Sequence, residues 1–350
     1  MALEMTSRER VLAALRGEET DCLPVICVNQ HATYEQMEKL GVGWPEAHND
    51  GIKMAALAAG GYSILGLDAV RVPYCQTFEA EALGSGLKDG GKTNLPSINV
   101  HPLKIGDRPQ FPADFLERGR IPELIKAVKL LKENIGDQVV VMAGVIGPFS
   151  IATSLLGITE LLMASFKTPD AVRPYIEFAE KAGTVLANAL IEAGADVIVV
   201  EDMMASLDMI SPKIFRELAV PYQKMQIEQI KAPTIIHICG KLDALMPDIA
   251  KTGAAAISVE HTVDIPGALG KFREEGIKVP IIGAIDPVKT LFQGTPEAVA
   301  GEVLKGYQDG VALISPGCAV PPATTTGNLL AMVAAAREIK PGMKGGDTNE

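Results

Sequence analysis

The chain has 350 residues, of which 47% are hydrophobic, so it can bury the core of one large domain or two small ones. Its formal charge is −11, because 43 acidic residues outnumber 32 basic ones, and this argues against nucleic acid or an anionic membrane as a partner. Neither a leading basic-then-apolar segment nor an apolar stretch of bilayer length is present, which argues against secretion and membrane spanning.

The first predicted element is a helix that follows Thr6. Thr6 and Glu9 have the spacing of a capping box, and apolar residues recur after them until Gly17. Eight short runs rich in β-branched residues come next, each ending in polar or small residues, and we interpret them as strands. They cover 23–28, 69–75, 139–147, 196–202, 233–240, 255–262, 280–287 and 311–318.

Helical patterns separate most of these strands. They cover 121–135, 171–193, 212–231, 242–252, 265–275 and 296–309. Alternation of strand and helix through eight strands predicts a (β/α)₈ TIM barrel, formed by a single domain over 1–340. The alternative is a doubly wound open sheet. A glycine-rich excursion at 84–101 is predicted to form a loop or hairpin over the barrel mouth. The ending, 341–350, has the composition of a flexible tail.

Three potential metal ligands lie at predicted strand ends. His237 and Cys239 are two residues apart near the end of the fifth strand, so they project from the same face, and Cys318 ends the eighth. Barrel active sites lie at these carboxyl ends, and strands five and eight face each other across the mouth. One imidazole and two thiolates suit zinc and leave a coordination position for a reacting group. The simpler interpretation, ordinary core cysteines and a core histidine, fits three converging ligands less well.

The five cysteines of the chain are scattered and odd in number, which does not suit a disulfide framework. We therefore expect a reducing, cytoplasmic location in which thiols are free to hold metal. Zinc with two thiolates and a neutral imidazole carries almost no net charge and is a weak Lewis acid. It can still lower the pKa of an incoming thiol from about 8.5 and keep its sulfur nucleophilic. The ligand set therefore favours alkyl transfer to sulfur over hydrolysis.

Two acidic residues at neighbouring strand ends are further candidates. Asp202 and Glu260 end the strands that flank the strand of His237. Alternation places Asp202 on the face of Ile198 and Val200, and Glu260 on the face of Ser258. Each is a candidate fourth ligand or a group that orients His237, and the alternative is a cap on the next helix. Asp286 is predicted to be a helix cap, and His31 and His261 to lie at the surface or the mouth.

Several segments together resemble a known family. They are 8–17 (RERVLAALRG), 44–48 (WPEAH), 69–75 (AVRVPYC), 147–149 (GPF), 192–196 (EAGAD), 237–240 (HICG) and 315–318 (SPGC). From 6 to 338 the chain resembles the uroporphyrinogen decarboxylase superfamily, and WPEAH with HICG resembles its methylcobalamin:coenzyme M methyltransferase branch. The resemblance implies a barrel that holds zinc through His237, Cys239 and Cys318. It also implies that a thiol, coenzyme M, takes a methyl group from a methylated corrinoid carried by a separate protein.

One segment departs from the decarboxylase pattern. That branch has Met-Arg-Gln-Ala-Gly-Arg in its first strand, whereas this chain has CVNQHA at 27–32 and lacks both arginines that a polyanionic porphyrinogen requires. A decarboxylase of a smaller acid is therefore a weaker alternative. A further alternative is a corrinoid- or tetrapyrrole-binding protein without catalysis, in which the three ligands hold a structural zinc. Coenzyme M carries a sulfonate, for which Arg71 and Lys241 are candidate cations. Gln30 and Tyr74 also end strands and are candidate substrate contacts. Tetrahydrofolate is the alternative acceptor.

Overall fold

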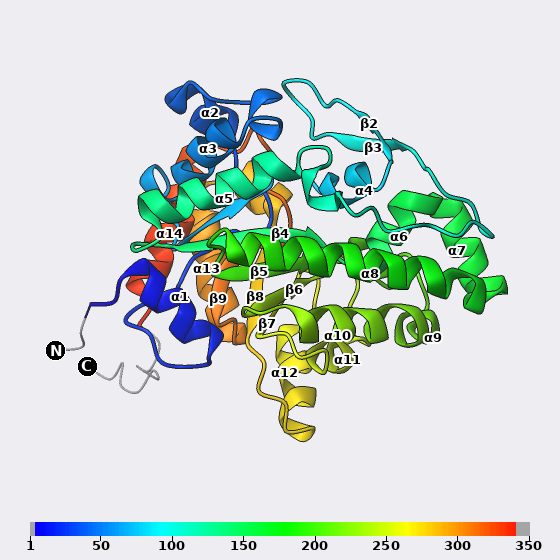
Figure 1. Cartoon of the computed structure of the whole chain (residues 1–350). Helices are drawn as coiled ribbons and strands as arrows, with labels where there is room; N and C mark the ends of the chain where they lie inside the picture. The colour runs from blue at the N-terminus through cyan, green and yellow to red at the C-terminus, as the bar shows by residue number, and fades with distance from the viewer. Residues whose placement is uncertain (1–3, 341–350) are drawn as a thin grey trace, which may run out of the picture.

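Seven parallel strands form one curled sheet in the order β1-β4-β5-β6-β7-β8-β9 in this computed structural model, which describes residues 4–340 (Figure 1). The tail predicted at 341–350 lies outside the described residues. The order follows the sequence, whereas a doubly wound sheet reverses direction at a switch point. The barrel prediction is confirmed. The strands are β1 (Ala69–Val72), β4 (Val140–Ile146), β5 (Val197–Glu201), β6 (Thr234–His237), β7 (Ala256–Ser258), β8 (Ile281–Ile285) and β9 (Leu313–Pro316).

The first predicted strand, 23–28, closes the ring between β9 and β1 but is not a regular strand. Val25 makes an isolated parallel bridge with Ile314. The Ile26 N–H donates to the Ile314 carbonyl at 2.9 Å, and the Asp68 N–H donates to the Val25 carbonyl at 2.8 Å. Pro24 has no N–H, and the Val25 N–H donates to the Asp68 side chain at 2.8 Å instead of to a backbone carbonyl. The segment 23–28 therefore lies where it was predicted, but a hydrogen bond to the Asp68 side chain replaces part of the backbone hydrogen bonding of a regular strand.

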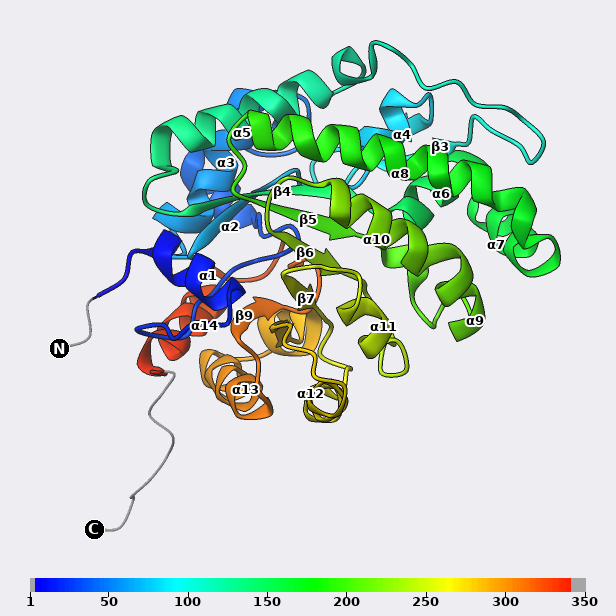
Figure 2. The same ribbon diagram turned by 60° about the horizontal axis from the view of Figure 1, so that its bottom comes forward.

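Helices cover the outside of the curled sheet (Figure 2). They are α1 (Ser7–Leu15), α2 (Tyr34–Leu40), α3 (Gly51–Ser63), α4 (Phe78–Ala82), α5 (Ile121–Ile135), α6 (Pro148–Leu156), α7 (Ile158–Lys167), α8 (Pro169–Glu192), α9 (Pro212–Ile214), α10 (Val220–Gln229), α11 (Met246–Ala250), α12 (Ile265–Glu274), α13 (Pro296–Asp309) and α14 (Thr326–Glu338). The helix predicted over 212–231 is interrupted by a π-helical turn, Phe215–Ala219, just before Pro221, whose nitrogen cannot donate. Within residues 4–340, no single helix is long and apolar enough to cross a membrane; α6 and α7 meet that criterion only as a bent pair.

The two faces of the sheet bury different sets of side chains. Along β5, Val197 and Val199 belong to the cluster inside the barrel, whereas Ile198 and Val200 pack outward against the helices. Helix α1 closes the amino-terminal end of the barrel, because its apolar residues join the inner cluster. The predicted capping box of α1 is confirmed. The carboxyl-terminal end of the barrel is left as the place for a site.

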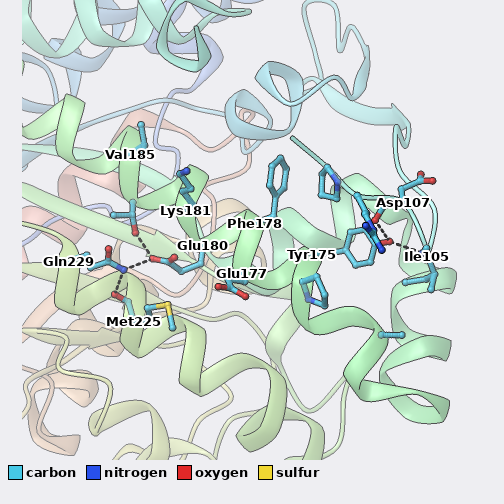
Figure 3. A pocket seen from close by; sticks show the side chains of 16 residues that line it. Ile105, Asp107, Tyr175, Glu177, Phe178, Glu180, Lys181, Val185, Met225 and Gln229 are labelled. Atoms are coloured by element: carbon cyan, nitrogen blue, oxygen red, sulfur yellow. Dashed lines mark hydrogen bonds between the residues drawn. The ribbon is translucent and has the colours of Figure 1, made fainter. Parts of the chain in front are cut away.

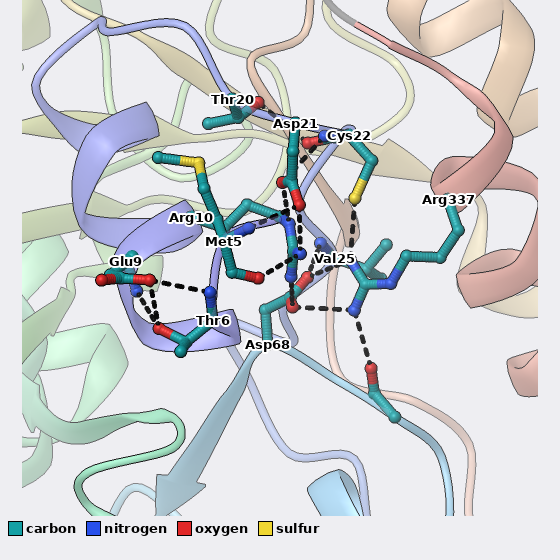
Figure 4. A network of polar contacts seen from close by, with 11 residues as sticks. Met5, Thr6, Glu9, Arg10, Thr20, Asp21, Cys22, Val25, Asp68 and Arg337 are labelled. Carbon is teal, nitrogen blue, oxygen red and sulfur yellow. Dashed lines mark hydrogen bonds and ion pairs between the residues drawn. The ribbon is translucent and has the colours of Figure 1, made fainter. Parts of the chain in front are cut away.

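An ionic network ties the amino-terminal end of the barrel together (Figure 4). Asp68, fully buried just before β1, accepts from Arg10 of α1 at 2.7 Å and from both terminal nitrogens of Arg337 of α14 at 2.7 Å. Arg10 also pairs with Asp21 at 2.6 Å. One carboxylate thus joins α1, α14, the 23–28 segment and the start of β1.

The excursion predicted at 84–101 contains a small antiparallel hairpin. Its strands are β2 (Gly86–Lys88) and β3 (Ser97–Val100), and it lies on the same side of the molecule as α4 and α6 (Figure 1). The imidazole of His101, just after β3, is bonded through Nδ1 to the Ser154 carbonyl of α6 at 2.7 Å. This contact fixes the end of the hairpin to the wall of the barrel mouth.

Candidate metal and thiol site

His237, Cys239 and Cys318 converge at the carboxyl ends of β6 and β9. His237 Nε2 lies 3.0 Å from Cys239 Sγ, and that sulfur lies 3.7 Å from Cys318 Sγ. The three ligand atoms all lie within 4.8 Å of one another, and they form the one group with metal-ligand geometry among the described residues. Gly240 has a positive φ of +89°, which turns the chain directly after Cys239.

The donor set and its surroundings fit zinc. One imidazole nitrogen and two sulfurs are the ligands of a three-residue zinc site, and their mutual distances suit one shared ion. His237 is fully buried, and its Nδ1 lies 3.0 Å from Ser258 Oγ of β7, which leaves Nε2 free to face the thiols. The hydrogen bond between Cys239 and Cys318 lowers the pKa of Cys318 and raises that of Cys239. His237, Cys239 and Cys318 are therefore the residues that would hold the metal.

Glu260, two residues beyond β7, is half-buried beside this triad. Burial is the largest cause of its raised pKa, followed by the nearby Cys318 sulfur, whereas His237 and His261 act in the opposite direction. Its carboxylate is not among the atoms that lie within 4.8 Å of one another, so it is a neighbour of the triad in this structure. A fourth-ligand role for Glu260 remains a prediction.

Asp202 lies on the face of Ile198 and Val200, as alternation predicts, and this face points away from the barrel interior and its metal ligands. Its Oδ1 accepts from the Ser150 N–H at 2.8 Å and from Ser150 Oγ at 2.7 Å, at the start of α6. Its Oδ2 accepts from Gln223 of α10 at 2.8 Å. Asp202 therefore caps the start of α6, a helix that precedes it in the chain, whereas the alternative left open by the sequence was a cap on the next helix. The sequence does not show that this face is the outer one, because all four residues before Glu201 are apolar and the strand is buried on both faces.

Glu201, which was not among the predicted site residues, occupies the inward position. It is the register partner of His237 in the parallel pair β5–β6, so the two side chains lie on the same face of the sheet. Its two oxygens accept from Arg71 of β1 and from Asn29 Nδ2, the latter at 2.5 Å. A lone arginine in the apolar strand AVRV was the available signal, because a buried guanidinium needs a carboxylate from another strand.

A cavity of about 450 Å³ opens beside the triad. Cys239, Cys318, Arg71 and Glu201 line it, together with polar residues at the start of α6 and with 95–98 of the hairpin. Arg71 Nε and Asn29 Oδ1 are buried and have no partner among the described residues. The cavity therefore offers unsatisfied hydrogen-bonding atoms next to the metal ligands, as a small-molecule site requires.

Three of the four predicted substrate contacts line this cavity, namely Gln30, Arg71 and Tyr74. The fourth, Lys241, does not. The Tyr74 hydroxyl donates to the Met54 carbonyl at 2.9 Å, so its ring, not its hydroxyl, is presented to the cavity. Lys241 is 76% exposed and lies 3.8 Å from Asp208 in a surface ion pair. Lys241 was predicted from its closeness in sequence to Cys239, but the turn at Gly240 directs it outward.

His31 was expected at the surface or the mouth and is instead buried behind the cavity wall. Its ring packs at 6.3 Å from that of Tyr74, and His48 approaches the same tyrosine at 6.1 Å. Burial lowers the pKa of both histidines to about 4. His261, by contrast, is partly exposed and lies 3.2 Å from Asp286, and Asp286 caps the turn that begins at Pro287, as predicted.

A larger cavity of about 980 Å³ lies outside the barrel, between α8, α10 and the 105–109 segment (Figure 3). Its lining includes Tyr175, Phe178 and Met225, and the buried Glu180 accepts there from Thr184 at 2.7 Å and from Gln229 at 3.0 Å. It holds none of the metal-ligand group and no strand end. Size alone therefore does not identify the reactive site.

Glu79 of α4 makes the stability of this region depend on pH. It is 2% exposed, its Oε1 accepts from the Ile146 N–H at 2.7 Å, and burial raises its pKa to about 7 from 4.5. The folded state keeps a proton that the unfolded chain releases above about pH 4.5, so this contribution to stability is lost as pH rises through 7. We expect Glu79→Gln, which keeps the acceptor atom, to stabilise the protein by about 1–3 kcal/mol at pH 8 and by less at pH 5. Urea unfolding at both pH values measures this, and equal gains would contradict it.

A barrel whose strand ends gather one imidazole and two thiols beside a small polar cavity has the arrangement of an enzyme that acts on small molecules at the mouth of the barrel. The chain belongs to the uroporphyrinogen decarboxylase family, whose profile, Uroporphyrinogen decarboxylase (URO-D), matches residues 6–339.

Similar proteins locate the chain within this family. It is 36% identical to the methylcobamide:CoM methyltransferase MtaA of Methanosarcina barkeri over 96% of this chain and 98% of that one. It is 38% identical to MtbA of Methanosarcina acetivorans, covering 96% and 99%. A solved methyltransferase from Methanosarcina mazei superposes with a TM-score of 0.91 at 34% identity, covering 96% and 99%. The predicted resemblance to the methyltransferase branch is confirmed, and the chain is an enzyme of the methyltransferase type.

Proposed function

We propose that this enzyme transfers a methyl group from a methylated corrinoid, carried by a separate protein, to a small thiol bound beside a zinc ion, with coenzyme M as the foremost acceptor. The observation that supports this most directly is the convergence of His237 Nε2 with two cysteine sulfurs at the mouth of the cavity. Full-length relatives named for methylcobamide and CoM support the donor and the acceptor. We infer a reducing cytoplasm as the location, because the cysteines are free thiols.

His237, Cys239 and Cys318 would hold the zinc, which when bound lowers the pKa of an incoming thiol so that the acceptor sulfur is anionic. Ser258 orients His237 by bonding Nδ1. The cavity wall holds the rest of the acceptor with its sulfur directed toward the ligands. The thiol proton passes to solvent when the thiol binds. In the transfer, the sulfur lone pair forms the new S–CH₃ bond, and the cobalt–carbon electron pair stays with cobalt as Co(I).

The size of the cavity indicates that the two substrates bind in different places. About 450 Å³ accommodates a small thiol, whereas a corrin ring with its side chains is larger and must present its methyl group from the mouth. Residues 95–98 of the hairpin and three residues of α6, Ser150, Thr153 and Ser154, line this cavity. The methyl donor therefore approaches from the side of β2, β3 and α6, where the carrier protein would dock.

Demethylation of methylcobalamin, followed by its absorbance, tests the proposal. We expect conversion to Co(I)cobalamin with coenzyme M and no conversion without a thiol. Homocysteine and tetrahydrofolate, offered in turn, distinguish the other acceptors. Turnover with tetrahydrofolate alone would replace the acceptor, and the absence of turnover with every acceptor by zinc-loaded enzyme would overturn the function.

A further inference from the structure

The charged groups in the cavity wall balance each other. Apart from the metal-ligating cysteines and His101, the residues that line the cavity in the described chain include only two ionisable groups charged at neutral pH, Arg71 and Glu201. They form an ion pair in which the side chains are 2% and 1% exposed. The one cation in the wall is therefore not free, because a carboxylate already neutralises it.

The position of this pair is fixed by three strands. Arg71 extends from β1 across β4 to reach Glu201 on β5, and it passes directly over Gly144, where an added Cβ would lie 3.0 Å from its Cζ. A second terminal nitrogen donates to the Pro73 carbonyl at 2.8 Å, and Asn29 holds the other oxygen of Glu201. Since Glu201 pairs in register with His237, the balanced charges lie next to the metal ligands.

We propose that Glu201 determines the charge selectivity of the acceptor pocket: by neutralising Arg71, it weakens the preference for anionic thiols over neutral thiols of the same length. This inference rests on the proposed function. Methylation of the sulfur leaves the remote anionic group of the acceptor, such as a sulfonate, unchanged, so a free guanidinium would hold that group in the product as firmly as in the substrate. The carboxylate of Glu201 thus favours release of such a product.

Charge substitution at this pair tests the proposal. We compare kcat/KM for 2-mercaptoethanesulfonate with kcat/KM for 2-mercaptoethanol, which differ in the anionic group on the same two-carbon chain. In Glu201→Gln the shape is kept, and Asn29 can turn its amide so that its oxygen accepts from the new NH₂. We expect the anionic-to-neutral ratio to rise roughly tenfold or more, since a unit charge acts a few ångströms away at an effective dielectric constant of about 20. Product inhibition by 2-(methylthio)ethanesulfonate should strengthen in parallel.

The matched variant Arg71→Gln leaves Glu201 uncompensated and should shift the same ratio in the opposite direction. The double variant should return the ratio close to that of the parent. A merely structural role would change both thiols alike, so an unchanged ratio in the single variants overturns the inference. Should Glu201→Gln not fold, the Arg71→Gln and double variants still decide by the direction of the ratio. If the parent enzyme methylates neither thiol, the proposed function fails instead, which is a distinct result.

Discussion

Cys239→Ala should lose its metal and its methyl transfer together. Two of the three ligands remain, and His237 and Cys318 alone cannot hold zinc in the geometry of the parent. A free thiol with a pKa of about 8.5 is roughly 3% ionised at pH 7, so loss of the ionising effect alone would slow transfer about thirtyfold. A larger decrease would show that the metal also positions the sulfur. Metal content by elemental analysis and methylcobalamin demethylation are the measurements.

Cys75→Ser is the matched control for this experiment. Cys75 lines the same cavity, but its sulfur lies 3.4 Å from Thr77 Oγ1 and 3.6 Å from Arg120, not in the triad. A serine hydroxyl can keep both contacts, so we expect metal content equal to that of the parent. A Cys239→Ala protein with full metal and full turnover would refute the site assignment.

Asp68→Ala should strongly destabilise the fold. The Asp68 carboxylate is fully buried between Arg10 and Arg337, whose side chains are 7% and 30% exposed. Its removal leaves two guanidinium groups facing each other and the Val25 N–H without its acceptor. Breaking a buried pair on one side costs about 3–5 kcal/mol, and we expect a decrease in the free energy of unfolding of that size.

Urea unfolding measures this decrease, and Asp114→Ala serves as its control. Asp114 pairs with Arg118 at 2.8 Å, but the side chains are 54% and 44% exposed. Such a surface pair contributes about 0–1 kcal/mol. Equal effects of the two substitutions would show that the network at the amino-terminal end of the barrel does not stabilise the fold.

The fold was predictable because its signals are local and repeated. Helices α5 and α13 have the predicted bounds, and seven strands fall within predicted runs. Regions such as α3 and α6 were missed, since their small and apolar residues give no clear helical alternation. The first strand was predicted in place, but its bonding to the Asp68 side chain depends on a residue more than 40 positions away in the sequence.

The site was predictable only in part, because the sequence does not always show which face of a strand a residue occupies. His237, Cys239 and Cys318 were found because their chemistry is distinctive and their spacing fits one face of a strand. Asp202 was chosen as the candidate acid in place of Glu201, because β5 is buried on both faces and its sequence does not show which face is the inner one. Lys241 was misplaced because the chain turns at Gly240, whose φ is positive, and the lysine side chain is then directed to the surface.

Because the Arg71 side chain crosses Gly144 to reach Glu201, substitutions at positions 71, 144 and 201 depend on one another. A chain that acquires a side chain at 144 must first give up the long cation at 71, and then the acid at 201 would be left alone in a closed space. We therefore expect homologous sequences to change these positions jointly: either arginine, glycine and glutamate occur together, or all three are replaced. An enzyme that has exchanged the whole set for uncharged residues would keep a cavity wall without net charge, and with it the charge selectivity of the parent, while its metal ligands stay the same.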